Sequence, residues 1–209
     1  MKIQKIDLAG RTLEQVFEGI APEKIACCNW EADFPYAPNV TFKMFHTGEK
    51  LYLRFDVEEQ YTMAHITEDN GDVWTDSCCE FFFSLDGKAY YNIECNCIGR
   101  MLCGYYTEQG APALRAGADI LSQVERIPSL GTEPFDERIG DNKWSLMMVV
   151  PPTIFHQDKV ESWSGLKLKI NLYKIGDNLS KPHYLSWQPI ALPKPCFHCP
   201  EFFKEVELE

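Results

Sequence analysis

The sequence predicts an all-β protein in which two antiparallel sheets pack as a sandwich of the immunoglobulin-like or jelly-roll-like kind. Apolar and polar residues alternate with a period of two in run after run, which is typical of strands with one buried face. Turn pairs such as Asp86-Gly87 separate neighbouring runs. Helix signals are few, so we expect roughly ten strands at short spacing with little helix between them.

The amino-terminal third begins with a strand-like pattern at residues 1–8 and a short helical pattern at residues 11–20. Two alternating runs, residues 40–44 and 51–57, are joined by a short hairpin connection at residues 47–50. A further strand is predicted at residues 61–66.

The centre of the chain holds its most apolar run. Residues 79–85 are nearly all apolar, which is consistent with a central strand covered on both faces. Residues 89–97 follow the Asp86-Gly87 turn as the partner strand. A helical turn is expected at residues 151–155, with Pro152 near its start. Other strands are predicted at residues 100–107, 121–127, 143–150, 166–174 and 203–208.

The segment before the last strand carries two aromatic clusters in a loop stiffened by five prolines. A tryptophan held on such a loop, here Trp187, suits a surface that stacks on a flat ligand, and a sugar ring is the first candidate. Large aromatic residues are also the usual lids of hydrophobic cores, so Trp187 fits that role equally well.

Length and composition exclude several classes of protein. The 209 residues fit a single domain spanning residues 1–209. A net charge of −11 with no basic patch argues against nucleic acid, and no apolar run is long enough to span a membrane. The nine cysteines cannot all pair, and residues 1–8 lack the apolar core of a signal peptide. We therefore expect a cytoplasmic protein, or a secreted or periplasmic one if a leader has been removed.

The entry to the central strand carries candidate site residues. Trp74 lies shortly before Glu80, which heads an otherwise apolar strand and needs a partner or solvent there. One interpretation is a structural ion pair between Glu80 and Arg100. The other is that these two side chains hydrogen-bond sugar hydroxyls beside the Trp74 face, with Asn96 and Tyr184 as further candidates.

Five segments, residues 72–82, 91–99, 173–177, 183–189 and 197–203, resemble in order and spacing the family 9 carbohydrate-binding modules and their relatives in the DOMON-like superfamily. The resemblance runs from Trp30 onward. It implies a β-sandwich without catalytic groups, in which two tryptophans matching Trp74 and Trp187 clamp a terminal sugar. Glu80 and Arg100 match positions that hydrogen-bond hydroxyls. Characterised members bind the reducing ends of glucan or xylan chains and hold structural calcium.

Two metal sites are conceivable. Asp69, Asp72 and Asp76, with Glu68, could supply the oxygen ligands of the calcium that the resemblance implies, or they could form a solvated acidic loop. The run Cys196, His198 and Cys199 resembles half of a zinc site. Because the chain is solitary and rich in cysteine, a soluble mono- or oligosaccharide is a more plausible partner than an insoluble polysaccharide.

Two other functions stay open on the sequence. A glycoside hydrolase acting on a soluble oligosaccharide would need paired carboxylates, such as Glu80 with Asp76 or Glu94, at a separation that a sequence does not give. A structural domain that has lost its ligand would instead bury both Trp74 and Trp187 in its core.

Overall fold

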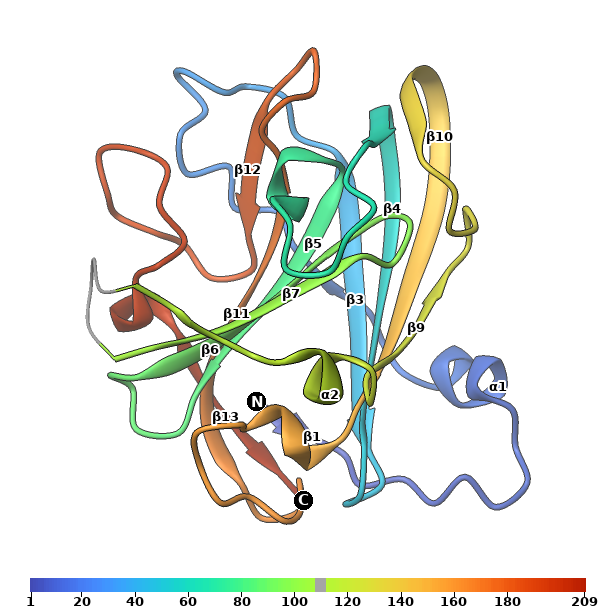
Figure 1. The fold of residues 1–209 in the computed structure, drawn as a ribbon, viewed down its shortest axis with the longest axis vertical. Helices are drawn as coiled ribbons and strands as arrows, with labels where there is room; N and C mark the ends of the chain where they lie inside the picture. The colour runs from blue at the N-terminus through green and yellow to red at the C-terminus, as the bar shows by residue number, and fades with distance from the viewer. Residues whose placement is uncertain (108–111) are drawn as a thin grey trace.

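The computed structural model describes residues 1–107 and 112–209, which fold into two packed β-sheets (Figure 1). In this described part, the larger sheet has eight strands and the smaller has five. The larger sheet runs in the order β1 (Lys2–Ile3), β13 (Lys204–Leu208), β11 (Lys167–Gly176), β5 (Cys78–Ser84), β6 (Tyr90–Asn96), β7 (Met101–Tyr106) and β8 (Leu114–Arg115), and β12 (His183–Ser186) also pairs with β11. The smaller sheet runs β2 (Glu23–Lys24), β3 (Asn39–His46), β4 (Leu51–Ala64), β10 (Phe135–Val150) and β9 (Glu125–Pro128).

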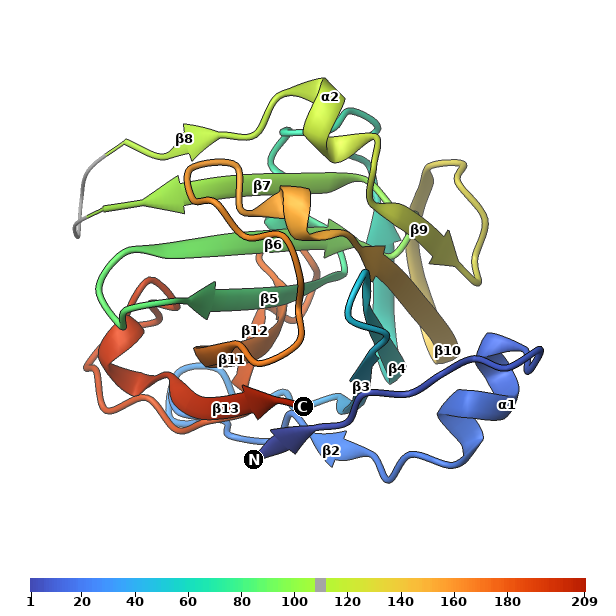
Figure 2. The ribbon, with the colours of Figure 1, turned by 90° about the horizontal axis from the view of Figure 1, so that it is seen from below.

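Pairing is antiparallel throughout the named strands except between β1 and β13, which run parallel and bring the two ends of the chain together (Figures 1 and 2). Figure 2 shows β5 to β8 side by side in one layer, with β3, β4 and β10 in the other. The predicted sandwich of antiparallel sheets is therefore confirmed.

Alternation along the strands of the larger sheet separates two apolar clusters. On β5, Phe81 and Phe83 point into the core between the sheets, whereas Phe82 belongs to a second cluster on the outer face. Central strands whose two faces are both covered carry near-continuous apolar runs, which explains the composition of β5. The outer cluster is covered by the segments around Trp30 and Phe197.

Several predicted boundaries were wrong. The strands predicted at residues 51–57 and 61–66 form one long strand, β4, which ends at Ala64, and β10 begins at Phe135 rather than at residue 143. Residues 121–127 were predicted as a strand, but the short helix α2 (Ala118–Leu121) ends there and β9 begins only at Glu125. The proline-rich segment was predicted as loop, yet its first residues form β12 against β11.

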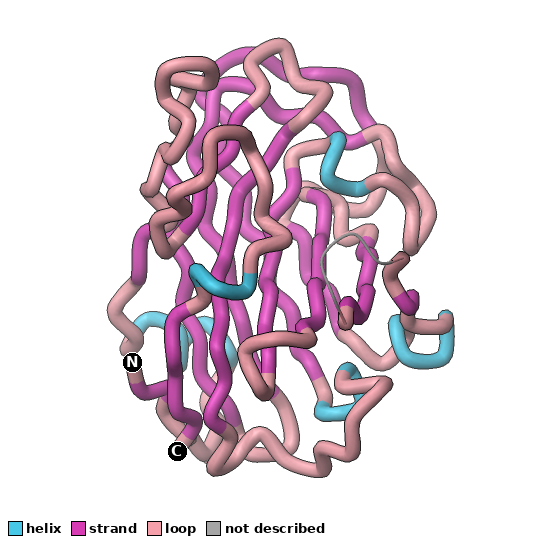
Figure 3. Tube along the Cα trace, turned by 90° about the vertical axis from the view of Figure 1, so that its left-hand side faces the viewer, coloured by secondary structure: helices cyan, strands magenta, loops and turns pink. Residues whose placement is uncertain are grey.

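The helices are short and lie in the connections between strands (Figure 3). Helix α1 (Leu13–Glu18) begins with a capping box between Thr12 and Gln15. Three single turns of 3-10 helix are η1 (Val73–Thr75), η2 (Pro152–Ile154) and η3 (Pro200–Phe202). Among the described residues, no helix has the length and apolar character needed to cross a membrane. All nine cysteines are free thiols.

The core between the sheets contains a buried ionic cluster. The Lys174 ammonium on β11 lies 2.8 Å from a carboxylate oxygen of Glu59 on β4, and both side chains are fully buried. It also contacts Nε2 of His183 at 2.7 Å and donates to the Ile175 carbonyl oxygen at 3.0 Å. The three donors of the ammonium are thus all used. Burial and the adjacent lysine lower the pKa of His183 well below its usual value, so its Nε2 is an acceptor here.

Candidate functional site

The strongest candidate site is a cavity of about 350 Å³ on the outer face of the larger sheet. That volume falls at the lower end of the range for small-molecule sites. Its floor comes from β5, β6 and β11, and its walls come from η1, β12 and the segment that follows residue 194. The lining residues combine aromatic and charged side chains: Trp74, Glu80, Glu94, Tyr106, Arg115, Ile175, Asp177, Tyr184, Pro195, Cys196, Phe197 and His198.

Two carboxylates lie side by side on the cavity floor. Glu80 on β5 and Glu94 on β6 are directly opposed across the strand pair, which places their Cβ atoms about 5 Å apart. They are only 2% and 5% exposed. Burial, Glu94 and Asp177 raise the pKa of Glu80 well above its usual value, and burial raises the pKa of Glu94 to about 7. This pair therefore retains protons at a pH where ordinary glutamates are ionised.

Arg115 supplies the positive charge beside this pair. It lies on the two-residue edge strand β8, opposite Gly104 of β7, which in turn is opposite Asn92 of β6. A Cβ on Gly104 would lie 3.1 Å from Nη1 of Arg115 and 2.9 Å from Oδ1 of Asn92, so the absent side chain leaves room for the guanidinium. Asn92 donates to Glu94 at 2.6 Å, which links the amide to the acidic pair.

The aromatic walls are held by backbone contacts between η1 and the end of β11. The Asp177 N–H donates to the Trp74 carbonyl oxygen at 3.3 Å, so the partly exposed indole and this carboxylate stay close together. Tyr184 projects from β12 to the same outer face, and burial together with nearby Asp177 raises the pKa of its phenol.

The segment after residue 194 is fixed to the sheet by aromatic contacts. The ring of Phe197 stacks on Tyr173 of β11 at 4.1 Å, and the His198 imidazole contacts the Tyr90 hydroxyl at 2.9 Å. Burial and Arg115 lower the pKa of His198 to about 4, so this imidazole is neutral near pH 7. Side-chain contacts therefore hold this part of the cavity wall against the sheet.

The structure does not form the predicted tryptophan pair. Trp74 lines the cavity, but Trp187 is 7% exposed and lies in the core between the sheets, with its ring edge-on to Phe42 of β3 at 5.5 Å. Its Nε1 donates to Glu23 at 3.2 Å. The two indoles are on opposite faces of the larger sheet, because Trp187 continues the inward side of β12 after Leu185. Of the two interpretations of Trp187, the core role is the correct one.

Arg100 and Asn96 lie outside the cavity lining. Asn96 is the last residue of β6 and Arg100 immediately precedes β7, and the Asn96 Oδ1 accepts from the Arg100 N–H at 2.8 Å. The Asn96 amide donates to Asp76 at 2.8 Å and to the Ile66 carbonyl oxygen at 3.0 Å. No ion pair joins Glu80 and Arg100 in the described residues. Glu80 and Tyr184, by contrast, do line the cavity with Trp74.

The three aspartates predicted to hold calcium do not converge. Asp76 accepts from the N–H groups of His65 and Ile66, both at 2.9 Å, so its carboxylate fixes a loop. Asp69 pairs with Arg126 at 2.7 Å, and Asp72 precedes η1. Within residues 1–107 and 112–209, no group of three or more histidine, cysteine or acidic side chains could hold a metal ion, and this includes the run Cys196, His198 and Cys199.

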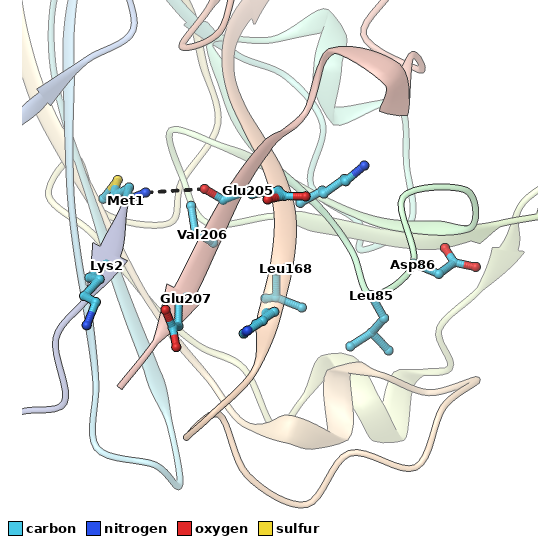
Figure 4. Close-up of a pocket in the computed structure, with 10 residues that line it drawn as sticks. Met1, Lys2, Leu85, Asp86, Leu168, Glu205, Val206 and Glu207 are labelled. Atoms are coloured by element: carbon cyan, nitrogen blue, oxygen red, sulfur yellow. Dashed lines mark hydrogen bonds between the residues drawn. The ribbon is translucent and has the colours of Figure 1, made fainter.

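A second groove lies at the other end of the larger sheet (Figure 4). It has a volume of about 680 Å³, and the Met1 amino group donates to the Glu205 carbonyl oxygen at its edge. Its lining has three lysines, the Met1 amino group and three carboxylates and, among the described residues, no aromatic side chain. Without a flat platform it is the weaker candidate for a sugar. It is lined by Met1, Lys2, Leu85, Asp86, Lys167, Leu168, Lys169, Glu205, Val206 and Glu207.

Several lining residues were missed from the sequence. Tyr106 shares the outward side of β7 with Leu102, so the period-2 pattern of residues 100–107 could have placed it there. Arg115 lies on a strand too short to show a pattern, and Asp177 follows the last residue of β11. Arg115 carried no local signal, and Asp177 ended one of the segments that resemble the family without being predicted to line a site.

The buried acidic pair gives a prediction on stability. A glutamate whose pKa is raised on folding contributes stability that is fully present below its unfolded pKa, near 4.5, and is lost as the pH rises through its folded pKa, about 7 for Glu94. Glu94→Gln should therefore be more stable than the unmodified protein at pH 8, by about 1–2 kcal/mol, with a smaller difference at pH 5.

Urea unfolding at both pH values measures this difference. The matched control is Glu161→Gln, which removes the same charge from an exposed position. If Glu94→Gln and Glu161→Gln change stability equally at pH 5 and pH 8, the raised pKa of Glu94 is wrong.

The family model described as carbohydrate-binding family 9 matches residues 12–208. A crystal structure of a candidate carbohydrate-binding protein from Bacteroides uniformis is 40% identical, with a TM-score of 0.92, covering 100% of this chain and 98% of that chain. Comparison with curated protein sequences gives no match.

Two more distant structures share the fold. Both are family 9 carbohydrate-binding modules from Caldicellulosiruptor kristjanssonii, one in complex with glucose and the other with cellotriose. The glucose complex is 10% identical with a TM-score of 0.62, covering 100% of this chain and 95% of that chain. The cellotriose complex is 8% identical with a TM-score of 0.63, covering 100% and 93%.

Proposed function

This chain belongs to carbohydrate-binding family 9, and from that premise we propose that its outer cavity binds the terminal residue of a soluble saccharide without covalent chemistry. The observation that carries the proposal is the lining of the cavity, where aromatic side chains adjoin buried carboxylates and a guanidinium. A pyranose has an apolar C–H face and a belt of hydroxyls, so it needs both kinds of surface at once.

Trp74 and Tyr184 are the aromatic surfaces we assign to the sugar faces. Both line the cavity and belong to the outer cluster. Trp187 has no part in this arrangement because it lies in the core. Tyr184 comes from the same segment of sequence but projects to the other side of the sheet, and it takes the role first assigned to Trp187.

The hydroxyls of the sugar would contact the charged groups on the cavity floor. Arg115 offers donors only, whereas the Glu80 and Glu94 carboxyls accept when ionised and can also donate when protonated. A ring hydroxyl both donates and accepts, so it can bridge the guanidinium and a carboxyl group. In this way the floor would fix the orientation of a ring stacked on Trp74.

Isothermal titration of the protein with glucose and cellotriose tests this function, because two structures of similar fold are complexes with these sugars. We expect saturable binding that Tyr184→Ala weakens by about tenfold, the loss from one stacking surface. Tyr61→Ala, on strand β4 of the other sheet, is the matched control and should leave the affinity unchanged. If no neutral mono- or oligosaccharide in a panel gives a measurable heat of binding, the proposal is contradicted.

Hydrolysis is the second candidate, and one observation favours it: two acids with raised pKa values lie side by side in the cavity. The same samples can be assayed with chromogenic glycosides. Turnover that disappears in Glu80→Gln would make the protein a glycoside hydrolase. Binding of saccharides without turnover supports the proposed non-catalytic function.

A further inference from the structure

The charges that line the outer cavity do not balance. Glu80, Glu94 and Asp177 contribute three carboxyl groups, whereas Arg115 is the one permanent cation among the described lining residues. His198 adds no charge near pH 7, because burial and Arg115 lower its pKa to about 4. A further carboxylate, Asp72, is close enough to act on Glu94. The cavity is thus acidic even when the Glu80 and Glu94 pair holds one proton.

Two of these carboxyl groups have oxygens with no partner in the described part of the chain. Glu94 is only 5% exposed, and its buried Oε2 accepts no hydrogen bond. Oδ1 of Asp177 is likewise buried and unpaired. Buried acceptors without donors are costly, and the large majority in folded proteins are satisfied. Since both residues line the cavity, a donor on the ligand would satisfy them.

The aromatic walls favour the same kind of ligand. Trp74, Tyr106, Tyr184 and Phe197 surround the acidic groups in one cavity. Aromatic faces attract cations through their quadrupoles, and rings combined with carboxylates form the sites that recognise alkylammonium groups. A neutral sugar would use the rings but would leave the excess negative charge uncompensated.

We propose that the sugar held in this cavity carries a protonated amine, as in a 2-amino-2-deoxy sugar, and that Glu94 and Asp177 bind the ammonium group. The inference rests on the proposed function and goes further, because it names the substrate class. Charge-assisted hydrogen bonds are about twice as strong as neutral ones, so the amine should dominate the choice between sugars that share a ring shape. Acetylation of the amine removes its charge, so the acetylated sugar should not be bound more tightly than the neutral sugar.

The test compares three ligands of one ring configuration, glucose, glucosamine and N-acetylglucosamine, by isothermal titration at pH 7. We expect glucosamine to bind at least about tenfold more tightly than either neutral sugar, the equivalent of 1.4 kcal/mol or more. Glu94→Gln should reduce this ratio toward one, whereas the matched charge removal Glu161→Gln should leave the ratio unchanged.

The outcomes separate the two proposals. Glucose binding equal to or tighter than glucosamine binding would overturn the inference and leave the proposed function standing. Equal affinity for glucosamine and N-acetylglucosamine would overturn it too. If none of the three sugars binds, both proposals fail. The comparison among ligands uses the unmodified protein, so it holds even if Glu94→Gln does not fold.

Discussion

Trp74→Ala is expected to weaken saccharide binding by about 30-fold or more. A tryptophan that anchors a ligand in a lined cavity typically contributes 2 kcal/mol or more, and about 1.4 kcal/mol corresponds to a factor of ten. Trp74 is partly exposed on the single turn η1, so its removal exposes little of the core and the fold should persist. Titration of the variant with the tightest ligand of the unmodified protein measures the change.

The matched control is Trp187→Phe. This side chain lies in the core and outside the cavity lining, so the substitution should cost stability while the affinity stays within about twofold. A loss of affinity in Trp187→Phe as large as that in Trp74→Ala would show that the binding surface has been assigned to the wrong face of the sheet.

Lys174→Met is expected to destabilise the protein by about 3–5 kcal/mol. Removing one partner of a buried ion pair leaves an uncompensated charge, here the Glu59 carboxylate 2.8 Å from the ammonium. The carboxylate keeps its bond from Nε1 of Trp144 at 2.7 Å, which does not replace the lost cation. Urea unfolding measures the difference at neutral pH.

The double variant Lys174→Met with Glu59→Gln separates loss of the pair from loss of packing. Without the charge on residue 59, much of the penalty should disappear, so the double variant should be more stable than Lys174→Met alone. A loss below about 1 kcal/mol in Lys174→Met would contradict the view that this pair is tightly coupled. A double variant whose loss of stability equals the sum of the losses in Lys174→Met and Glu59→Gln would contradict it as well.

The fold could be predicted because its signal is local. In the β5–β6 hairpin, the apolar run, the Asp86-Gly87 turn and the alternation of residues 89–97 all predict an antiparallel strand pair, and β5 and β6 do pair in this way. The missed strand β12 shows the opposite case. The flanking prolines Pro182 and Pro189 suggested a loop, but pairing with β11 through residues 183–186 decided its conformation. Tertiary hydrogen bonding there overrode local composition.

The error at Trp187 has a simple physical cause. In β12 and the residue after it, Leu185 and Trp187 share the inward side and Tyr184 faces outward, as a period of two requires. Applied to residues 183–187, this rule would have placed the tryptophan in the core. The family resemblance matched Trp187 by residue type and did not take into account which side of the strand the residue faces.

Other parts of the site were out of reach of any local rule. Trp74, Glu80 and Tyr184 were predicted, and they line one cavity. Arg115 and Asp177 join them from an edge strand and a strand end that carry no pattern. The unpaired oxygen of Glu94 depends on how three strands bring their side chains together, which only coordinates reveal.

The indole of Trp74 is the surface assigned to the ligand, and a ¹H–¹⁵N spectrum of the labelled protein titrated with glucosamine or cellotriose tests this assignment directly. The other four indoles donate to protein acceptors, namely Trp30 to Leu192, Trp144 to Glu59, Trp163 to Val150 and Trp187 to Glu23. With peaks assigned from Trp74→Phe and Trp187→Phe, we expect the Trp74 Nε1–H resonance to move on saturation while that of Trp187 stays in place. A stationary Trp74 resonance in a saturated sample would contradict the site.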